Sequence, residues 1–419
     1  MTQTADRPSA RAVFHAAVTG IGLVTPAGIG ELENWAQVCA GVSTAATDPA
    51  LAGLQVDFSC RIPQFDADEL LGRKIAWRIA RFVQLALIAA RQAVASAGLD
   101  SQTWEGDRIA IVVGNSLGGT QTMEDQQSRF LEEGAKMVSP MTIPAAMMNM
   151  VAGHLAIDLA ATGPSMVTAT ACASGTTAIG LARSMLRSGE CDIVIAGGAE
   201  SALSQTAMAT LSKMGALSQR SSEPRSACRP FDAARDGFVA AEAAGFLVLE
   251  RMSEARARDA PIRALVSGYG AASDAHHPTM PHPDGAGIER AMRTALNDAH
   301  LDGTEIDHVN AHGTSTPLND STEAAAVRRV LGQRPAVTST KGVTGHTLAA
   351  AGAIEAAYAV LAIEHQMVPP TANLDHLDPL VELDIVTGEP RPMPVAAAMS
   401  TSLGFGGHNA ALVITSASA

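Results

Sequence analysis

The chain has 419 residues, of which 47% are hydrophobic and 17% charged, and its formal net charge is −13. This composition provides for a large buried core and excludes a disordered chain. A general nucleic-acid binder is usually basic, so the acidic balance also argues against nucleic acid as a partner. Only 3% of the residues are aromatic, and we therefore expect a core built from small aliphatic side chains.

The cysteines and the longest uncharged stretch indicate the compartment. Five cysteines form no CxxC pair, which argues against a disulfide framework or a zinc site and favours a reducing cytoplasm. Residues 159–182 carry no charge but include Gly163, Pro164 and many hydroxyl side chains, so they are predicted to be core and not a membrane span. Residues 1–12 are predicted to form a flexible N-terminal tail without a signal peptide.

Short apolar runs that end in glycine-rich turns alternate with helical patterns in the first part of the chain. The predicted strands are 16–24, 108–113, 166–171 and 192–196, and the predicted helices are 77–97 and 176–186. This alternation is typical of an α/β domain with buried sheets. Basic residues near the first helix form either its solvated face or a patch for an acidic protein partner. They are Arg73, Lys74, Arg78 and Arg81.

The second part of the chain repeats this plan. Its predicted strands are 264–268, 307–310, 336–340 and 396–402, and an Ala-rich helix is predicted at 348–363. The repeated order indicates a duplication, with a boundary in the charged region 251–262. We therefore predict an N-terminal half, 13–255, and a C-terminal half, 256–419, each with its own core sheet. Slim Ala-rich helices would lie between the two sheets.

Four segments at predicted strand ends carry the chemistry. Cys172 lies in TACASG (170–175), before a helix whose unpaired N–H groups would favour a thiolate. His312 lies in NAHGTSTP (310–317) and His346 in STKGVTGH (339–346), and both histidines follow strands. Adjacent glycines in GFGGHN (404–409) would let backbone N–H groups approach a ligand. A cysteine with two nearby N–H donors suits a reaction that places negative charge on a thioester oxygen.

These four segments, in this order, resemble the β-ketoacyl-acyl-carrier-protein synthase family, a branch of the thiolase superfamily. The resemblance runs from Val18 to Asn409 and is similar to the elongating Cys-His-His type. Family members that prime chains from acyl-coenzyme A have Asn where His346 stands. Degradative thiolases carry a second Cys near the C-terminal glycine-rich turn, which has none here.

The resemblance implies an α/β thiolase fold whose duplicated halves give a five-layered αβαβα architecture. It implies an acyltransferase that works in fatty-acid or type II polyketide elongation, with an acyl-carrier protein as partner. It also implies either a homodimer or a heterodimer with a chain-length-factor-like subunit. Neither a cofactor nor a metal is expected, and neither nucleic acid nor a membrane is an expected partner.

The resemblance also implies a role for each matched residue. Cys172 would carry the acyl chain as a thioester, and the N–H groups of Cys172 and Phe405 would form the oxyanion hole. His312 and His346 would bind the malonyl thioester carbonyl and stabilise the enolate that forms on loss of CO₂. Phe405, with Gly406, would also gate access to Cys172.

Supporting residues follow from the same resemblance. Lys341 would pair with Glu323 and orient the histidines, and Glu355 would support that network from the buried helix. Residues expected to contact the phosphopantetheine arm or the acyl chain are Thr314, Thr316, Leu117, Met141 and Thr142. Relatives often have aromatic residues near positions 141 and 142, where the acyl pocket meets the dimer partner, and neither residue is aromatic here.

Other features suggest different functions. Residues 114–118, GNSLG, match the nucleophile elbow of an α/β-hydrolase-like serine esterase, with Ser116 as nucleophile. That interpretation leaves Cys172 and His346 unexplained. A third alternative is a non-catalytic partner subunit, but catalytically silent relatives lack the nucleophilic cysteine. A cluster that could suggest a metal site fits no defined spacing and is predicted to be a loop at the site entrance; it comprises Asp274, His276, His277 and His282.

Overall fold

The first half of the chain builds one side of the central sheet. In the computed structural model, which describes residues 13–417, its strands pair in the order β6-β5-β7-β8-β1. β5 is parallel to β6 and β7, whereas β8 is antiparallel to β7 and β1. The strand bounds are β1 Ala16–Thr25, β5 Ile109–Gly114, β6 Ser165–Thr168, β7 Ile193–Glu200 and β8 Ala243–Arg251. The predicted tail, 1–12, lies outside the described residues.

The second half repeats the same topology. Its strands pair in the order β11-β10-β15-β16-β9, with β10 parallel to β11 and β15, and with β16 antiparallel to β15 and β9. The strand bounds are β9 Ala264–Ser273, β10 His308–Asn310, β11 Ala336–Thr338, β15 Ala397–Gly404 and β16 His408–Thr415. β13 (Asp384–Ile385) extends this half beyond β11. The matching strand order and directions confirm the duplicated architecture.

The two halves of the sheet are joined at one edge. β1 pairs antiparallel with β9, and Ala16 lies opposite Val266. The strands of both halves, together with β2 (Gly28–Ile29), therefore form a continuous sheet of 12 strands. We predicted one sheet per half, and this connection is an addition that gives hydrogen-bond partners to two edges that would otherwise be open.

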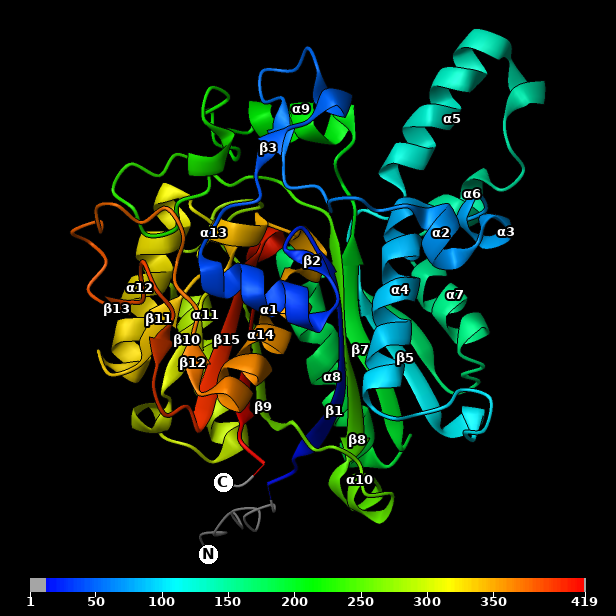
Figure 1. Ribbon diagram of the computed structural model, residues 1–419. Helices are drawn as coiled ribbons and strands as arrows, with labels where there is room; N and C mark the ends of the chain where they lie inside the picture. Colours follow the sequence, from blue (N-terminus) through cyan, green and yellow to red (C-terminus); the bar gives the residue numbers. More distant parts are fainter. Residues whose placement is uncertain (1–12, 418–419) are drawn as a thin grey trace, which may run out of the picture.

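Two helices fill the space between the halves of the sheet. α8 (Ser174–Ser188) and α14 (Ala351–His365) pack against each other and against strands of both halves, and Figure 1 shows them in the middle of the molecule. Their backbones approach closely, since a Cβ added to Gly352 would lie 1.9 Å from Thr176 Oγ1. Small residues at this contact are therefore required by the layered packing.

Other helices cover the outer faces. α4 (Arg81–Ser96) and α7 (Met150–Asp158) pack on the first half, and α11 (Ala286–Ala299) with α12 (Pro317–Leu331) lies on the second (Figure 1). Together with the central helices and the two halves of the sheet, they complete the five αβαβα layers of a thiolase fold. Within the described residues, one stretch is long and apolar enough to span a membrane by length and composition alone, Leu348–His365, and 89% of it is buried in the protein.

Some local predictions differ from the structure. The predicted helix 77–97 begins only at Arg81, and a separate short helix, α3 (Arg73–Ala76), precedes it. β8 and β16 were not predicted as strands. Both strands run antiparallel to the strand before them in the sheet. Neither is followed by one of the four motif segments on which the strand predictions depended.

Candidate active site

The three predicted chemical groups meet at one point between the halves. Cys172 lies in a short turn, Ala171–Ala173, directly before α8, while His312 follows β10 and His346 follows α13 (Lys341–Thr344). Cys172 Sγ and one ring nitrogen of each histidine lie within 4.8 Å of one another, and all three side chains are buried. His346 Nε2 is 3.1 Å from Cys172 Sγ. A thiol and two imidazoles therefore share one buried site.

The two histidine rings are held nearly perpendicular. Their centroids are 5.2 Å apart at an interplanar angle of 85°. Phe238 packs against the other side of His346 at 5.0 Å, also at 85°. The contact of Phe238 with His346 was not predicted from the sequence. An aromatic residue directly after Asp236-Gly237 nevertheless stands out in a chain with 3% aromatics.

Lys341 contacts one histidine and one carboxylate. Its Nζ lies 3.4 Å from His312 Nδ1 and forms a buried ion pair with Glu355. An amine bound to a carboxylate acts as a donor, so Nδ1 of His312 is the acceptor and the ring proton lies on Nε2. The expected pair of Lys341 with Glu323 is not formed among the described residues, because Glu355 on α14 takes that place.

Glu323 instead holds the backbone of the turn after β10. Its carboxylate accepts hydrogen bonds from the N–H groups of His312 and Gly313, both at 2.8 Å, and from Thr401 Oγ1 at 2.6 Å. Burial raises the pKa of Glu323. The residue therefore fixes the position of His312 through the main chain and not through Lys341.

Burial governs the ionisation of the site. It raises the pKa of Cys172 to about 12, with Lys341 and the N–H groups of Phe405 and Cys172 opposing the shift. Desolvation therefore outweighs the helix N-terminus that we expected to favour a thiolate. Burial, followed by the charge of Lys341, lowers the pKa of both His312 and His346 well below the usual value. Burial therefore favours the neutral forms of the thiol and of both imidazoles.

The glycine-rich turn after β15 lies over the thiol. The N–H of Phe405 is directed at Cys172 Sγ, and Phe405 as a residue is 36% exposed. Gly406 has a φ of 81°, and its N–H donates to the carbonyl of Pro278 at 2.7 Å. The predicted gate is therefore connected to the loop that carries the histidine cluster.

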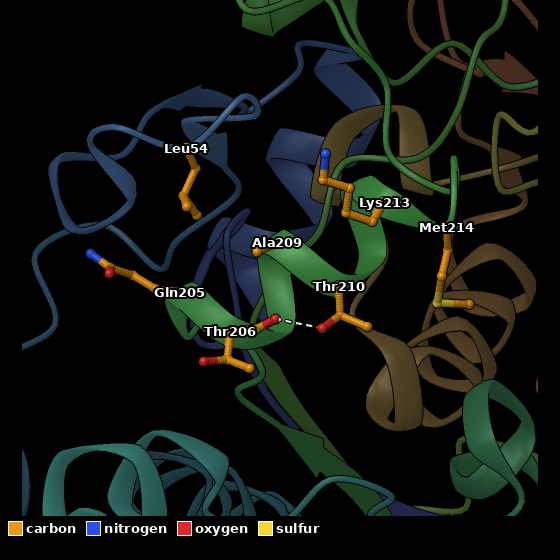
Figure 2. Close-up of a pocket in the computed structure, with 7 residues that line it drawn as sticks. All are labelled: Leu54, Gln205, Thr206, Ala209, Thr210, Lys213 and Met214. Atoms are coloured by element: carbon orange, nitrogen blue, oxygen red, sulfur yellow. Dashed lines mark hydrogen bonds between the residues drawn. The ribbon is translucent and has the colours of Figure 1, made fainter. Parts of the chain in front are cut away.

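An apolar cavity of about 650 Å³ leads to Cys172. Leu117, Thr314 and Thr316 line it, and the two threonine hydroxyls lie 2.9 Å apart. Met141 and Thr142 do not line this cavity within the chain. A shallower pocket of about 590 Å³ lies beside it on α9 (Gln205–Lys213), and Figure 2 shows its seven lining side chains. Thr206, Thr210 and Met214 line both spaces.

The structure gives the alternative motifs other surroundings. Ser116 Oγ contacts the carbonyl of Ala171 and the hydroxyl of Ser174, and no histidine contacts it in the part of the chain that the structure describes. The loop with Asp274, His276, His277 and His282 borders the cavity through Asp274 and Thr279–Pro281. Within residues 13–417, the only group of side chains that could hold a metal ion is Cys172 with His312 and His346.

The basic run near α3 is only partly free. Arg81 pairs with the buried Glu242 at 2.7 Å. Arg73, Lys74 and Arg78 are exposed and form no ion pair with any described residue. The predicted patch is therefore reduced to three cations.

A buried thiol beside two imidazole donors, at the end of an apolar cavity in a duplicated thiolase fold, defines a condensing acyltransferase. Residues 15–255 match the family described as beta-ketoacyl synthase, N-terminal domain, and residues 263–375 match its C-terminal domain. The chain belongs to the beta-ketoacyl synthase family.

Known proteins similar to this chain agree with that assignment. A 3-oxoacyl-[acyl-carrier-protein] synthase 2 of Synechocystis sp. is 42% identical, over 94% of this chain and 96% of its own. The structure titled "The ishigamide ketosynthase/chain length factor" has a TM-score of 0.91 and 34% identity, over 97% of this chain and all of its own. A chain of the structure titled "AntDE:AntF (apo): type II PKS acyl-carrier protein in complex with its ketosynthase bound to the hexaketide" has a TM-score of 0.88 and 30% identity. The match covers 96% of this chain and 99% of that one.

Proposed function

We propose that this protein is an elongating β-ketoacyl-[acyl-carrier-protein] synthase that carries the acyl chain on Cys172 and condenses it with a malonyl thioester. The 3.1 Å approach of His346 Nε2 to Cys172 Sγ, with His312 beside it, carries this proposal. The first half, 13–255, would supply the nucleophile, and the second half, 256–419, would supply both histidines and the gate.

In the loading step, Cys172 Sγ attacks the carbonyl carbon of an acyl thioester. The thiol proton passes to His346 Nε2 and then to the sulfur of the leaving phosphopantetheine, so that one thioester bond breaks while another forms. The N–H groups of Cys172 and Phe405 would bind the tetrahedral oxyanion. His346 Nδ1 has no partner among the described residues. Either tautomer of this ring can therefore form, and Nε2 can accept a proton in one step and donate in the next.

In the condensation step, the malonyl carboxylate leaves as CO₂ and its electron pair becomes an enolate. Nε2–H of His312 and Nε2–H of His346 would stabilise the enolate oxygen, and one such donor contributes about 3–4 kcal/mol. The enolate carbon then attacks the acyl carbonyl, and Sγ leaves as a thiolate and takes up one proton from solvent, which completes the balance. Lys341 would act through His312, because it keeps the ring proton on Nε2.

The cavity gives each end of the substrate a place. Thr314 and Thr316 would hydrogen-bond the phosphopantetheine arm, and Leu117 would limit the far end of the acyl chain. Met141 and Thr142 would reach this pocket only from a partner subunit. Arg73, Lys74 and Arg78 are exposed cations, and they would offer a docking patch to a carrier protein with an acidic surface.

A dimer suits the exposed surface of the first half. β6 is an edge strand with exposed residues, and α5 (Thr120–Glu133) projects from the body beside α6 (Thr142–Ala146) (Figure 1). Large apolar side chains exposed on this arm are Met123, Phe130, Leu131, Met137, Met141 and Ile143. An open strand edge next to exposed apolar residues favours pairing with a second copy or with a chain-length-factor-like subunit in the cytoplasm.

The proposal is tested by following each half-reaction. The purified chain is incubated with acyl-carrier thioesters of graded length, and intact-mass and peptide spectra locate the acyl group. Labelled malonyl-acyl-carrier protein is then added, and release of CO₂ and the two-carbon-longer β-ketoacyl product are measured. An acyl group on any residue other than Cys172, or an acyl-enzyme that malonyl thioester does not elongate, would contradict the proposal. The preferred chain lengths, and any need for a second subunit, separate fatty-acid from polyketide elongation.

A further inference from the structure

A buried carboxylate with no assigned role lies at the end of β7. Glu200 is fully buried, and its side chain accepts hydrogen bonds from the N–H of Ser116 at 3.0 Å and the N–H of Leu117 at 3.1 Å. Asn115 Nδ2 donates to its other oxygen at 3.1 Å. No lysine or arginine in residues 13–417 forms an ion pair with Glu200. Three donors of one turn therefore converge on this carboxylate.

The turn that Glu200 holds is part of the acyl cavity. Ser116 and Leu117 both line the cavity that leads to Cys172. The turn is also closed on itself, since Asn115 Oδ1 accepts from the N–H of Gly118 at 2.9 Å. Ser116 Oγ contacts the carbonyl of Ala171, the residue before Cys172, at 3.2 Å. A shift of this turn would therefore move Leu117 relative to the thiol.

The second half contains a related arrangement after the corresponding strand, although its glutamate comes from a helix, α12, and not from a strand end. β5 and β10 occupy equivalent positions in the two halves, and each is followed by a turn whose consecutive N–H groups bind a buried glutamate. In the second half the glutamate is Glu323, which binds the N–H groups of His312 and Gly313. Glu323 thus fixes a turn that presents a predicted catalytic group, and Glu200 fixes a turn that presents Leu117.

The hydrogen bonds to Glu200 stabilise its charged form, which burial disfavours. Desolvation raises the pKa of Glu200 to about 7, and the hydrogen bonds from Ser116, Leu117, Ser201 and Asn115 oppose that shift. A buried N–H group that loses its acceptor must find a new one, so removal of the carboxylate would release the turn.

We propose that Glu200 is a positioning residue that sets the acyl-chain length accepted by the enzyme, by holding the Asn115–Leu117 turn and with it the Leu117 side chain that lines the cavity. This inference rests on the proposed function, because only an acyl substrate would reach Leu117. It assigns to Glu200 no contact with the reacting atoms.

The test compares butyryl and dodecanoyl acyl-carrier thioesters as substrates for loading of Cys172. Glu200→Ala removes all the acceptors, whereas Glu200→Gln keeps one acceptor oxygen at nearly the same volume. We expect kcat/KM for the long chain, divided by that for the short chain, to fall about tenfold in Glu200→Ala, the equivalent of about two buried methylenes. The fall in Glu200→Gln should be smaller, and malonyl decarboxylation should be unchanged in both.

A double-mutant cycle between Glu200 and Leu117 provides the decisive test. Leu117→Phe alone should also lower the long-to-short ratio, and the effects of Glu200→Gln and Leu117→Phe should be non-additive, because both act on one side chain. Glu250→Gln is the matched control, since Glu250 is a fully buried carboxylate on β8, bound to Arg258 and Thr19 away from the cavity. It should lower stability without changing the ratio.

The outcomes distinguish a failure of the proposed function from a failure of the role assigned to Glu200. If the parent enzyme elongates no acyl thioester, the proposed function fails. If the parent elongates both substrates and the Glu200 variants lose activity toward them equally, or if the cycle is additive, only the role of Glu200 is overturned. Should Glu200→Ala fail to fold, Glu200→Gln and the cycle built on it decide the result alone.

Discussion

The two halves of the molecule have the same strand order but present different chemistry at their strand ends. The turn after β6 carries Cys172, and the segment after β11 carries Lys341 and His346. The turns after β5 and β10 each place consecutive N–H groups on a buried glutamate, Glu200 or Glu323. The duplicated fold therefore supplies equivalent positions, and in the proposed mechanism the first half carries the nucleophile whereas the second half carries both histidines.

The comparison also explains why burial favours the neutral forms of the thiol and of both imidazoles. Both halves contribute their groups to the same buried space, so desolvation acts on the thiol and on the imidazoles alike. A neutral imidazole is the form that can donate one N–H while its other nitrogen accepts. Substitutions of single groups in each half should show which step each group serves.

Removal of the first-half nucleophile should have the largest effect. We expect Cys172→Ala to lower condensation by about 10⁴-fold or more, as for other covalent catalysts that lose their nucleophile. Condensation is measured by product formation, and acylation by intact mass. Cys191→Ala is the control, because Cys191 is another buried cysteine. It lies just before β7 and does not line the cavity. Retained condensation in Cys172→Ala, with an acyl group on another residue, would contradict the assignment.

Removal of a second-half donor should affect the reaction of the second substrate most. We expect His346→Ala to slow malonyl decarboxylation by about 10²–10³-fold, the usual effect of losing one oxyanion donor. Part of the acylation of Cys172 should remain, since the oxyanion hole for that step lies in the backbone. The two half-reactions are followed separately with labelled substrates. Decarboxylation at the parental rate would show that the halves do not divide the work in this way.

The sequence predicted the layers and the central triad because strand-end turns and small-residue helices leave strong local patterns. TACASG, NAHGTSTP, STKGVTGH and GFGGHN all mark strand ends, and their groups do meet. Partner choice among buried charges was not predictable. Glu323 and Glu355 both lie near Lys341, and only the packing of α14 places Glu355 on its Nζ.

Lys341 provides a test of how the second half fixes its tautomer. We expect Lys341→Met to slow decarboxylation by about 10–100-fold, by analogy with the loss of a partner that orients a metal-binding imidazole. The variant also leaves Glu355 buried without its cation, which should cost about 3–5 kcal/mol of unfolding free energy. Adding Glu355→Gln should recover part of that stability but none of the rate. Recovery of the rate as well would mean that Lys341 serves only to neutralise Glu355.

The smallest expected effect is a change of stability with pH that leaves the chemistry untouched. His308 on β10 is fully buried, and burial lowers its pKa to about 4, from an ordinary value of 6.5. The unfolded chain therefore binds a proton below pH 6.5 that the folded chain refuses until about pH 4, so this residue's contribution to stability is present above 6.5 and is lost as the pH falls. The loss is about 1.4 kcal/mol for each pH unit in that window.

Burial raises the pKa values of Glu200 and Glu355 to about 7, so their contribution to the stability of the folded protein increases as the pH falls through the same range. A whole-protein pH profile would mix the two signs, so the measurement must be a difference. His308 Nδ1 contacts the carbonyl of Ala336 at 2.9 Å, and Asn can donate from that position without titrating. The unfolding free energy of the parent relative to His308→Asn should fall between pH 6.5 and pH 4, with equal decarboxylation rates at pH 7. A difference that stays constant with pH would show that His308 is not held neutral by burial, and would weaken the same argument for His312 and His346.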